Sequence, residues 1–516
     1  MLWIIACLIL SPLLVLFLIC LLRTWTLHSL QTPGLAAPRD TIPDHGTPDR
    51  DVSEYNTLEH RAQVVTIDKE EQIRIFAKTL TFKTIAHMYP EQFDTEPFLL
   101  LHQHLKESFP LCHSQLKFET IHELNLLYTW EGTNNTLPGI LLMAHQDVVP
   151  VEQGTEQNWK YEAFSGTIAD SFIWGRGALD IKNQLTGILS AVELLLKEGF
   201  QPERTVYLAF GCDEEVGGIA GTRLIAEHLA QHGTKLSYVL DEGGAIVKGM
   251  VPGIKKPVAL VGIAEKGYMT LTLEAVDKGG HSSMPPAHTA LGKACRAVTR
   301  IEARPFKPAI EGAVKHFIRY LAPELPFWER LILSNSWIFS RLIISIFSSS
   351  QATNALLRTT QAATMATASD KENVLPQKAS IKINLRILPG DTSKTVKAHI
   401  RKVIKDKNIT ISDPPYSLEA SKVSSPFARP FKKIQEVISS LFPEALTVPY
   451  LVLGGTDSRY YETLSENIYR FSPVLLDEQE LSGMHGTNER IAIDGYCTLI
   501  KFYYALIKKT ALGEQL

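Results

Sequence analysis

The chain has 516 residues, more than the roughly 250–300 at which a single hydrophobic core stops growing, so more than one folded unit is expected. Hydrophobic residues make up 45% of the chain and charged residues 21%, as in ordinary globular proteins. The net charge of -3 gives no basis for a nucleic-acid partner.

The chain opens with an apolar segment. Residues 2–22 carry no charge and Arg23 follows them, and about 20 apolar residues are enough for a helix to span a membrane. A cleaved signal peptide usually has a shorter apolar core of about 7–15 residues between a basic start and a small-residue cleavage site. We expect residues 1–25 to be an uncleaved anchor, or else a signal peptide. Either directs the rest of the chain into the secretory pathway, secreted or membrane-anchored outside the cytosol.

Residues 26–60 are expected to form a linker, because residues 31–53 contain four prolines and few large apolar side chains. Two glycosylation sequons, at Asn134 and Asn408, fit the secretory compartment. Two of the six cysteines lie in the apolar segment, and the others are widely spaced without a CxxC motif. This spacing argues against a zinc-thiolate site or a disulfide scaffold and leaves one or two disulfides open.

From about residue 69 helical and strand patterns alternate. Helices are expected at residues 70–88, 183–200 and 220–233, and strands at 138–149, 204–215 and 236–244. Short apolar strands alternating with amphipathic helices indicate an α/β fold with a mostly parallel mixed sheet flanked by helices. Residues 61–263 are the first part of this domain.

The pattern changes near residue 264. Strands are expected at 266–278, 352–365, 378–389 and 408–413, and helices at 288–303 and 393–406. This β-α-β-β-α-β order is typical of a ferredoxin-like α+β domain. Residues 264–415 are therefore expected to form a second domain inserted into the first, which resumes over 416–516.

Residues 306–350 are rich in Trp, Phe, Ile and Leu. The simpler interpretation is that they form extra core helices or a dimer surface. The functional interpretation is an apolar wall for a lipid-like substrate, or a patch that rests on a membrane.

Ionisable residues stand where the predicted strands of the α/β domain run into loops, which is where open α/β sheets build their sites. The candidates are His145, Asp147, Asp180, Glu214, Glu215, Asp241, Glu242 and, far down the chain, His485.

Two histidines with several carboxylates and no thiolate suit zinc, or cobalt or manganese in its place. A carboxylate such as Asp180 can bridge two ions held about 3.5–4 Å apart. His145 and Asp147 lie two residues apart on a strand and share a face, so Asp147 can orient the imidazole. Of Glu214 and Glu215, one can bind metal and the other act as general base; the residues alone do not say which.

Eight blocks of sequence resemble the signature blocks of the di-zinc aminoacylase/carboxypeptidase family. They are "MAHQDVVP", "GRGALDIKN", "GCDEEVGG", "LDEGG", "GGHSSMPP", "NLRILPG", "GGTDSR" and "MHGTNE". The resemblance extends over roughly residues 65–510. Within the family the chain is most similar to members that make and hydrolyse N-fatty-acyl amino acids.

The resemblance implies two Zn²⁺ per subunit and assigns roles to residues of the α/β domain. The implied metal ligands are His145, Asp180 as the bridge, Glu215, Asp241 and His485. Asp147 would orient His145, and Glu214 would be the general base. The family's ligand in "DEG" can also be read as Glu242, but Asp241 is preferred.

The resemblance also assigns residues of the inserted domain, which serves as a lid and dimerisation domain in the family. His281 matches a histidine that reaches across a homodimer to polarise the substrate carbonyl, and Asn354 and Arg386 match positions that hold the substrate's amide and carboxylate. From the residues alone, His281 beside two serines could instead cap a turn, and Arg386 could pair with a surface acid.

The expected function is zinc-dependent hydrolysis of the amide bond of N-acyl amino acids, with N-fatty-acyl amino acids as the implied small-molecule substrates. The same site could run in reverse and condense a fatty acid with an amino acid. A carboxypeptidase or dipeptidase on the same scaffold is the nearest alternative. A membrane-anchored binding module without activity is disfavoured, because Glu214 and every candidate ligand are present.

Overall fold

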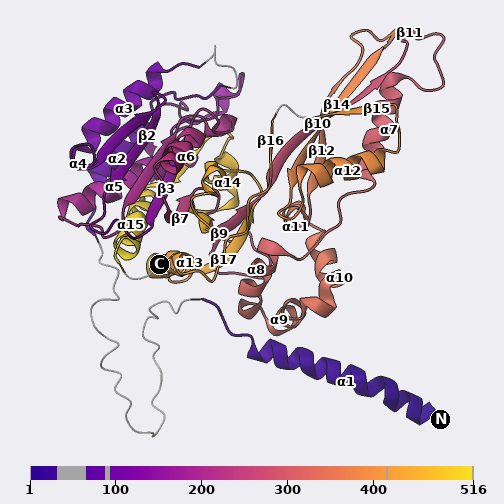
Figure 1. Cartoon of the computed structure of the whole chain (residues 1–516), viewed down its shortest axis with the longest axis horizontal. Coiled ribbons are helices and arrows are strands. Elements are labelled where there is room, and N and C mark those ends of the chain that lie inside the picture. Colours follow the sequence, from indigo (N-terminus) through magenta and orange to yellow (C-terminus); the bar gives the residue numbers. More distant parts are fainter. Residues whose placement is uncertain (1, 32–64, 88–92, 414–415, 514–516) are drawn as a thin grey trace. The chain divides into compact units, whose positions relative to one another are not determined.

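The computed structural model of the chain describes residues 2–31, 65–87, 93–413 and 416–513 (Figure 1). Most of the expected linker, 26–60, lies outside these residues. The chain divides into two units. The larger unit comprises Leu30–Gly262, Ser424–Val448 and Thr456–Leu516, and the smaller unit comprises Met1–Ser29, Ile263–Val423 and Pro449–Gly455.

The larger unit is built on a mixed sheet with a parallel centre. Over the described residues the strand order is β1-β2-β6-β3-β7-β18-β9-β8-β19, with β17 paired to β9. The parallel strands are β6 (Val206–Gly211), β3 (Gly139–His145), β7 (Leu236–Asp241) and β18 (Ile468–Arg470). The flanking strands are β1 (Lys117–Ile121), β2 (Asn125–Trp130), β8 (Ile246–Val247), β9 (Val258–Glu265), β17 (Leu446–Val452) and β19 (Leu475–Leu476).

Helices cover both faces of this sheet, which explains why every residue of β3 is buried. On one face Leu141 and Met143 pack against Ile225 and Leu229 of α6 (Thr222–Gln231). On the other, α5 (Lys182–Lys197) contacts β3 and packs on α15 (Ile493–Thr510). The remaining elements are α2 (Lys69–Thr79), α3 (Glu96–Ser108), α4 (Pro110–Gln115), α13 (Arg429–Leu441), α14 (Glu478–Gly483) and a small sheet of β20 (Arg490–Ala492), β5 (Phe172–Trp174) and β4 (Thr167–Ala169). The mostly parallel sheet predicted from the sequence is confirmed.

The helix expected at residues 70–88 is shorter than predicted. The helix α2 ends at Thr79, and the chain then runs beside the end of β3, where Ile85 forms a bridge with Val148. The Thr84 hydroxyl donates to Gln146 O at 2.6 Å, and Val148 N donates to Thr84 O at 2.9 Å. This pairing with a distant strand outweighs the local helical pattern.

The smaller unit contains an antiparallel sheet in the order β12-β14-β10-β15. These strands are β12 (Thr360–Thr367), β14 (Lys378–Ile387), β10 (Gly267–Val276) and β15 (Ile409–Ser412). Helices α7 (Ala290–Glu302) and α12 (Ser393–Ile404) pack on its buried face through alanine and branched aliphatic side chains. The short strand β16 (Ser417–Leu418) pairs with β10, and β11 (Gly280–His281) and β13 (Val374–Leu375) form a separate two-stranded sheet. The chain order of these elements is β-α-β-β-α-β, with further helices before β12.

The apolar residues 306–350 form three helices of the smaller unit, α8 (Gly312–Leu321), α9 (Phe327–Ser334) and α10 (Ser336–Phe347). The N-terminal helix α1 (Leu2–Thr26) contacts α9 (Figure 1). Where side chains are described, no single helix is long and apolar enough to cross a membrane. Helices α9 and α10 reach that composition only as a pair bent by 112°.

The strand expected at 352–365 is wrong in its first half. Residues Gln351–Leu357 form a helix, α11, and the strand β12 begins only at Thr360. The Ser350 side chain accepts from Thr353 N and so caps the helix at its start. Asn354 therefore lies on a helix rather than on a strand.

Candidate metal centre

Four segments of the larger unit bring imidazole and carboxylate groups to one edge of the sheet. His145 ends β3, Glu214 and Glu215 follow β6 in a short 3-10 turn, and Glu242 follows β7. Because these strands are parallel, their carboxyl ends meet at the same edge. The loop before α5 adds Asp180.

Asp180 lies between the two histidines. Its Oδ1 is 3.1 Å from His145 Nε2, and its Oδ2 is 2.8 Å from His485 Nε2. The carboxylate thus contacts one imidazole with each oxygen, although the two histidines are far apart in the sequence. This is the arrangement that a carboxylate bridging two ions requires.

Each histidine also has a glutamate of its own. His145 Nε2 is 3.3 Å from Glu242 Oε1, and His485 Nε2 is 3.2 Å from Glu215 Oε1. Two ligand atoms on a tetrahedral ion at about 2.0–2.1 Å lie about 3.3 Å from each other. The Glu215 oxygen is buried and has no hydrogen bond among the described residues. Two groups of donor atoms lie close enough together to hold a metal ion, His145 with Glu214 and Glu242, and His145 with Asp180 and Glu215. The cluster around Asp180 therefore fits metal binding.

The charges in this cluster compensate one another strongly. Burial opposes ionisation of Asp180, but hydrogen bonds to His145 and His485 outweigh burial and hold its pKa well below the usual range. Burial raises the pKa of Glu242 to about 8, and Asp180 adds to this rise. The carboxylates of Asp180 and Glu215 raise the pKa of His485 to about 10. The raised pKa values of Glu242 and His485 mean that, without metal, bound protons offset the negative charge of the carboxylates. A bound cation would offset the same charge in their place.

Glu214 is the carboxylate of the cluster that contacts neither histidine as an ion pair. It still lies close enough to His145 and Glu242 for one atom of each to share an ion. Burial raises the pKa of Glu214 well above its ordinary value, and the nearby Glu242 raises it further. A carboxyl group with a raised pKa can take up and release a proton near neutral pH, which suits a general base.

Asp147 is fully buried beneath this cluster. Its two oxygens accept from the backbone amides of Glu214, at 3.1 Å, and Glu215, at 3.0 Å. The expected contact with His145 is weaker, because Nδ1 lies 3.4 Å from Asp147 Oδ1 and only 3.0 Å from the backbone oxygen of Asp147. The Asp147 carboxylate therefore fixes the turn that carries the two glutamates, while its backbone orients His145.

The preference for Asp241 over Glu242 needs correction. The Asp241 side chain is buried and its Oδ2 accepts from Ser458 N at 2.8 Å. It is Glu242 whose carboxylate reaches His145. Successive residues at the end of a strand point to opposite sides, so only one of the two can face the cluster. The alternative reading of the "DEG" motif is the one the structure supports.

Arg176 and Glu489 are site residues that the sequence reasoning missed. Glu489 is fully buried and accepts from Arg176 Nη1 at 2.7 Å and from the amides of Gly177, Leu179 and Asp180 at 2.8–3.1 Å. Burial raises the pKa of Glu489, and the Arg176 charge opposes that rise.

Arg176 extends the same network to the second histidine, because its Nη2 donates to Gly486 O at 2.9 Å, next to His485. The Arg176–Glu489 pair thus ties the loop of the bridging aspartate to the loop of His485. Arg176 lies in the block "GRGALDIKN" and Glu489 in the block "MHGTNE". A charged residue inside such a block was the sequence feature that could have marked each of them as part of the site.

The substrate residues expected in the second domain all belong to the smaller unit. Arg386 on β14 pairs in register with Tyr268 and its guanidinium lies 5.0 Å from that ring. His281 follows the other end of β10, is exposed, and its Nδ1 lies 2.8 Å from Ser283 Oγ. Residues 268–276 of β10 extend about 27 Å at about 3.4 Å per residue. Arg386 and His281 therefore lie at opposite ends of this strand.

Asn354 is half-buried on α11, whose end is held by another residue that the sequence reasoning missed. Lys266 is buried and donates to Ala355 O at 2.9 Å and to Arg358 O at 2.8 Å. Burial lowers the pKa of Lys266 to about 7, and the charge of Arg386 lowers it further. Lys266 thus fixes the helix that carries Asn354.

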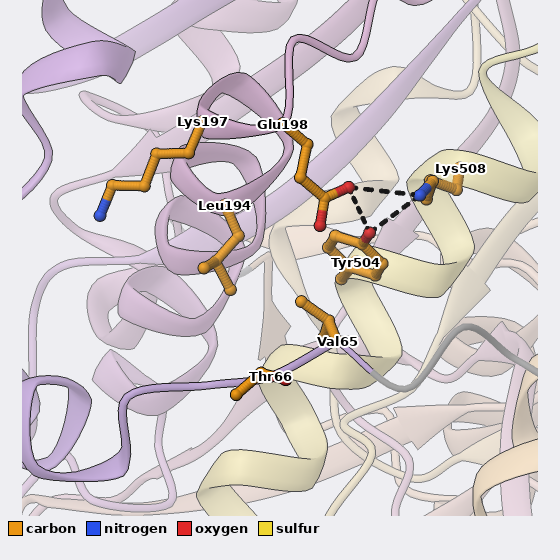
Figure 2. Close-up of a pocket in the computed structure, with 7 residues that line it drawn as sticks. All are labelled: Val65, Thr66, Leu194, Lys197, Glu198, Tyr504 and Lys508. Atoms are coloured by element: carbon orange, nitrogen blue, oxygen red, sulfur yellow. Dashed lines mark hydrogen bonds and ion pairs between the residues drawn. The ribbon is translucent and has the colours of Figure 1, made fainter.

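The larger unit also has an open pocket of about 520 Å³ that contains none of these residues. Figure 2 shows the polar ends of Glu198, Tyr504 and Lys508 pointing toward one another in this pocket. Glu198 Oε2 accepts from the Tyr504 hydroxyl at 2.6 Å and from Lys508 Nζ at 3.3 Å. Glu198, Tyr504 and Lys508 are paired with one another, and the pocket is lined by no histidine and by a single carboxylate, unlike the cluster around Asp180.

Comparison with known proteins agrees with this geometry. Residues 141–509 match the family described as peptidase family M20/M25/M40. The chain is 38% identical to probable carboxypeptidase S-like 2 of Dictyostelium discoideum, covering 88% of this chain and 87% of that protein. It is 35% identical to the human N-fatty-acyl-amino acid synthase/hydrolase PM20D1, covering 85% and 86%.

A solved structure shows the same fold. It is the M20 family metallo-carboxypeptidase Sso-CP2 from Sulfolobus solfataricus, with a TM-score of 0.62 at 19% identity, covering 86% of this chain and 99% of that chain. The cluster of histidines and carboxylates, the matched family and the two curated relatives lead to one conclusion. The chain belongs to peptidase family M20/M25/M40 and is a metallohydrolase that acts on amide bonds.

Proposed function

We propose that this chain hydrolyses N-acyl amino acids, with long-chain fatty-acyl amino acids as its substrates, using two zinc ions per subunit. The observation that carries the proposal is the position of Asp180, whose two oxygens contact His145 and His485 separately. By microscopic reversibility the same site condenses a fatty acid with an amino acid when the reactants are abundant.

One ion would be held by His145, Glu242 and Asp180, and the other by His485, Glu215 and Asp180. When bound, the pair supplies a Lewis acid that polarises the amide carbonyl and makes water more acidic. Glu489 and Arg176 hold the two loops that carry Asp180 and His485 in register with each other.

Glu214 transfers the proton, first as general base and then as general acid. Its carboxylate takes a proton from the attacking water as the new C–O bond forms at the amide carbon. When the C–N bond breaks, the same carboxyl returns the proton to the departing nitrogen, which leaves as the amine of the amino acid. Asp147 keeps Glu214 in place through its backbone amide. In the reverse direction each transfer is reversed and water is released.

The substrate class is supported by the 35% identity to the human N-fatty-acyl-amino acid synthase/hydrolase over most of both chains. Arg386 is the proposed partner of the substrate carboxylate, since a guanidinium binds both oxygens of that group, and Asn354 the partner of the amide. His281 lies at the other end of β10 from Arg386. We therefore propose that the smaller unit acts as a lid and dimerises, and that His281 serves the site of a second copy.

A carboxypeptidase is the second candidate. The 38% identity to a probable carboxypeptidase S-like protein favours it. Both activities would use the same cluster, because both break an amide bond next to a free carboxylate. They differ in what occupies the acyl side, a fatty chain or a second amino acid.

We further propose that the apolar helix α1 is retained as an anchor and that the larger unit lies outside the cytosol. Exposed Asn134 supports this, because it begins a sequon in a polar turn where its Oδ1 accepts from Thr136 N at 3.1 Å. The cysteines whose side chains are described, Cys20, Cys112, Cys212, Cys295 and Cys497, are free thiols, so the disulfides left open by the sequence are not formed among them.

The proposal is tested with the purified full chain in detergent, given N-oleoyl-phenylalanine and, separately, a free dipeptide such as Gly-Leu. We expect chelator-sensitive release of oleate at a higher kcat/KM than dipeptide cleavage. Glu214→Gln should keep its metal and lose about 10²–10⁴-fold in kcat. Faster dipeptide cleavage would reject the acyl substrate in favour of the peptidase. No chelator-sensitive turnover of either would reject both.

A further inference from the structure

Helices α9 and α10 expose an apolar face on the smaller unit. On α10 the exposed side chains are Trp337, Ile338, Leu342 and Ile346, joined by Arg341 and Ser345. Their spacing of three to four residues places them along one side of the helix. Trp328 on α9 is 68% exposed. Soluble monomers rarely present contiguous apolar surface of more than a few hundred Å² unless it binds something.

The N-terminal helix α1 docks at the bend between these two helices. Asn335, at the bend, is fully buried, and its side-chain amide donates to Cys20 O at 3.1 Å, Thr24 Oγ1 at 3.2 Å and Leu331 O at 2.9 Å. Arg330 of α9 donates to Leu27 O, just beyond the end of α1. The chain's first helix is thus fixed to residues three hundred positions later.

The buried polar groups of this junction face one another, and the exposed side chains around them are mostly apolar, with Arg23, Glu329, Arg341 and Ser345 among the exposed polar residues. Thr24 is buried against Asn335, whereas Phe17, Leu18 and Leu22 on the rest of α1 are 48–65% exposed. In a hydrocarbon environment every polar backbone or amide group has to be satisfied within the protein. The side-chain amide of Asn335 donates to the Leu331 carbonyl beside the bend and to two groups of α1, so these polar groups are satisfied within the protein.

The lengths of the helices indicate how such a surface would meet a bilayer. Residues 2–22 are uncharged, and a helix of that length, at 1.5 Å per residue, matches a hydrocarbon core of about 30 Å. Helix α10, with 12 residues, is about 18 Å long and cannot cross it. Because α9 and α10 contact the last turns of α1, they would lie at the level where α1 leaves the hydrocarbon.

The side chains at this level are those that proteins place at membrane surfaces. Trp25, Trp328 and Trp337 are all more than half exposed. The Arg23 guanidinium lies 6.0 Å from the Trp337 ring, and Arg341 is exposed on α10. Tryptophan rings favour the headgroup region, and arginines reach from an apolar surface to phosphates.

We propose that α9 and α10 form an interfacial contact with a phospholipid bilayer, lying in its surface beside α1. The partner is the headgroup and upper acyl region of phospholipids. The inference rests on the anchor proposed above in one respect, the insertion of α1. The contact fixes the smaller unit to the membrane at two points, so that the unit is not merely tethered by its first helix.

The test uses the full chain, with Cys7 and Cys295 replaced by serine, reconstituted in phosphatidylcholine nanodiscs. Single cysteines are labelled with an environment-sensitive fluorophore at Leu342→Cys or Ile346→Cys on α10. Leu13→Cys, at a position 55% exposed on α1 and about 13 Å along the helix from Leu22, reports the anchor. Met365→Cys, 56% exposed on β12, is the matched control in the same unit. Quenching is measured with lipids that carry a spin label near the headgroup or deep in the acyl chain.

We expect blue-shifted emission and quenching by the shallow label at Leu342 and Ile346, quenching by the deep label at Leu13, and neither at Met365. Quenching at Leu13 without any at Leu342 and Ile346 would overturn the contact and leave the anchor standing. A blue shift at Leu342 that no lipid quenches and that dilution abolishes would assign the face to a second copy and also overturn it. Loss of quenching at all sites would refute the anchor too, and none of these readouts depends on turnover.

Discussion

Replacing the buried Glu489 by glutamine tests the network that positions the bridging aspartate. Glu489 accepts four hydrogen bonds, from Arg176 and from the amides of Gly177, Leu179 and Asp180. Glutamine keeps one oxygen and turns the other into a donor, so two of these four donors lose their acceptor whichever way the amide points. Breaking a buried ion pair costs about 3–5 kcal/mol of stability. Loss of an outer partner of a metal ligand costs about 10–100-fold in metal affinity.

The assay is denaturant unfolding of the metal-free chain together with competitive zinc titration, for wild type and Glu489→Gln. Glu198→Gln is the matched control, since Glu198 has hydrogen-bonded partners in the same unit but lies at the surface (Figure 2). A surface ion pair contributes about 0–1 kcal/mol to stability, so the control should unfold at nearly the same denaturant concentration as the wild type. The pocket of Glu198 contains none of the residues around Asp180, so the control should also bind zinc as the wild type does. Equal behaviour of the two variants would refute the role given to Glu489.

Two further predictions concern the ligands and pH. Glu242→Gln should lower the bound metal from two ions to one, whereas Asp241→Asn should keep both ions and cost about 1 kcal/mol through a weaker bond from Ser458 N; metal analysis after dialysis decides, and the reverse pattern would restore Asp241 as the ligand. In the metal-free chain the raised pKa of Glu242, about 8 against 4.5, and of His485, about 10 against 6.5, both mean that the folded state holds protons more tightly, so stability should fall as pH rises from about 4.5 to 10. With zinc bound, protons compete with the metal, so stability should instead rise with pH across the lower part of that range. Thermal unfolding with zinc and with chelator measures both slopes, and parallel slopes would contradict the assignment.

Much of the fold follows from sequence periodicity. The buried run of β3 and the apolar faces of α5 and α6 predicted a parallel sheet with helices on both sides, and the structure has it. The errors occur where tertiary contacts decide. Thr84 and Ile85 stand in a helical pattern but pair with the end of β3, and residues 351–357 form a helix whose end is held by Lys266, which donates to two carbonyl groups there.

The sequence predicted which residue types form the candidate site and at which strand ends they lie. It did not predict which side chains contact one another. The sequence placed a carboxylate pair at the end of β7, and only the geometry separates Glu242, which reaches His145, from Asp241, which binds a backbone amide. Arg176 and Glu489 could not be recognised as partners, because nothing local links residues 313 positions apart. Likewise Asn335 reads as one polar residue in an apolar stretch until its contact with α1 is seen.

The proposed function depends on Asp180 bridging two divalent cations. A crystal of the full chain grown with zinc, measured just above and just below the zinc absorption edge, tests this directly. We predict two anomalous peaks about 3.5–4 Å apart, one beside His145 and Glu242 and the other beside His485 and Glu215, with Asp180 between them. A single peak, or two peaks that do not share Asp180, would show that Asp180 does not bridge two cations.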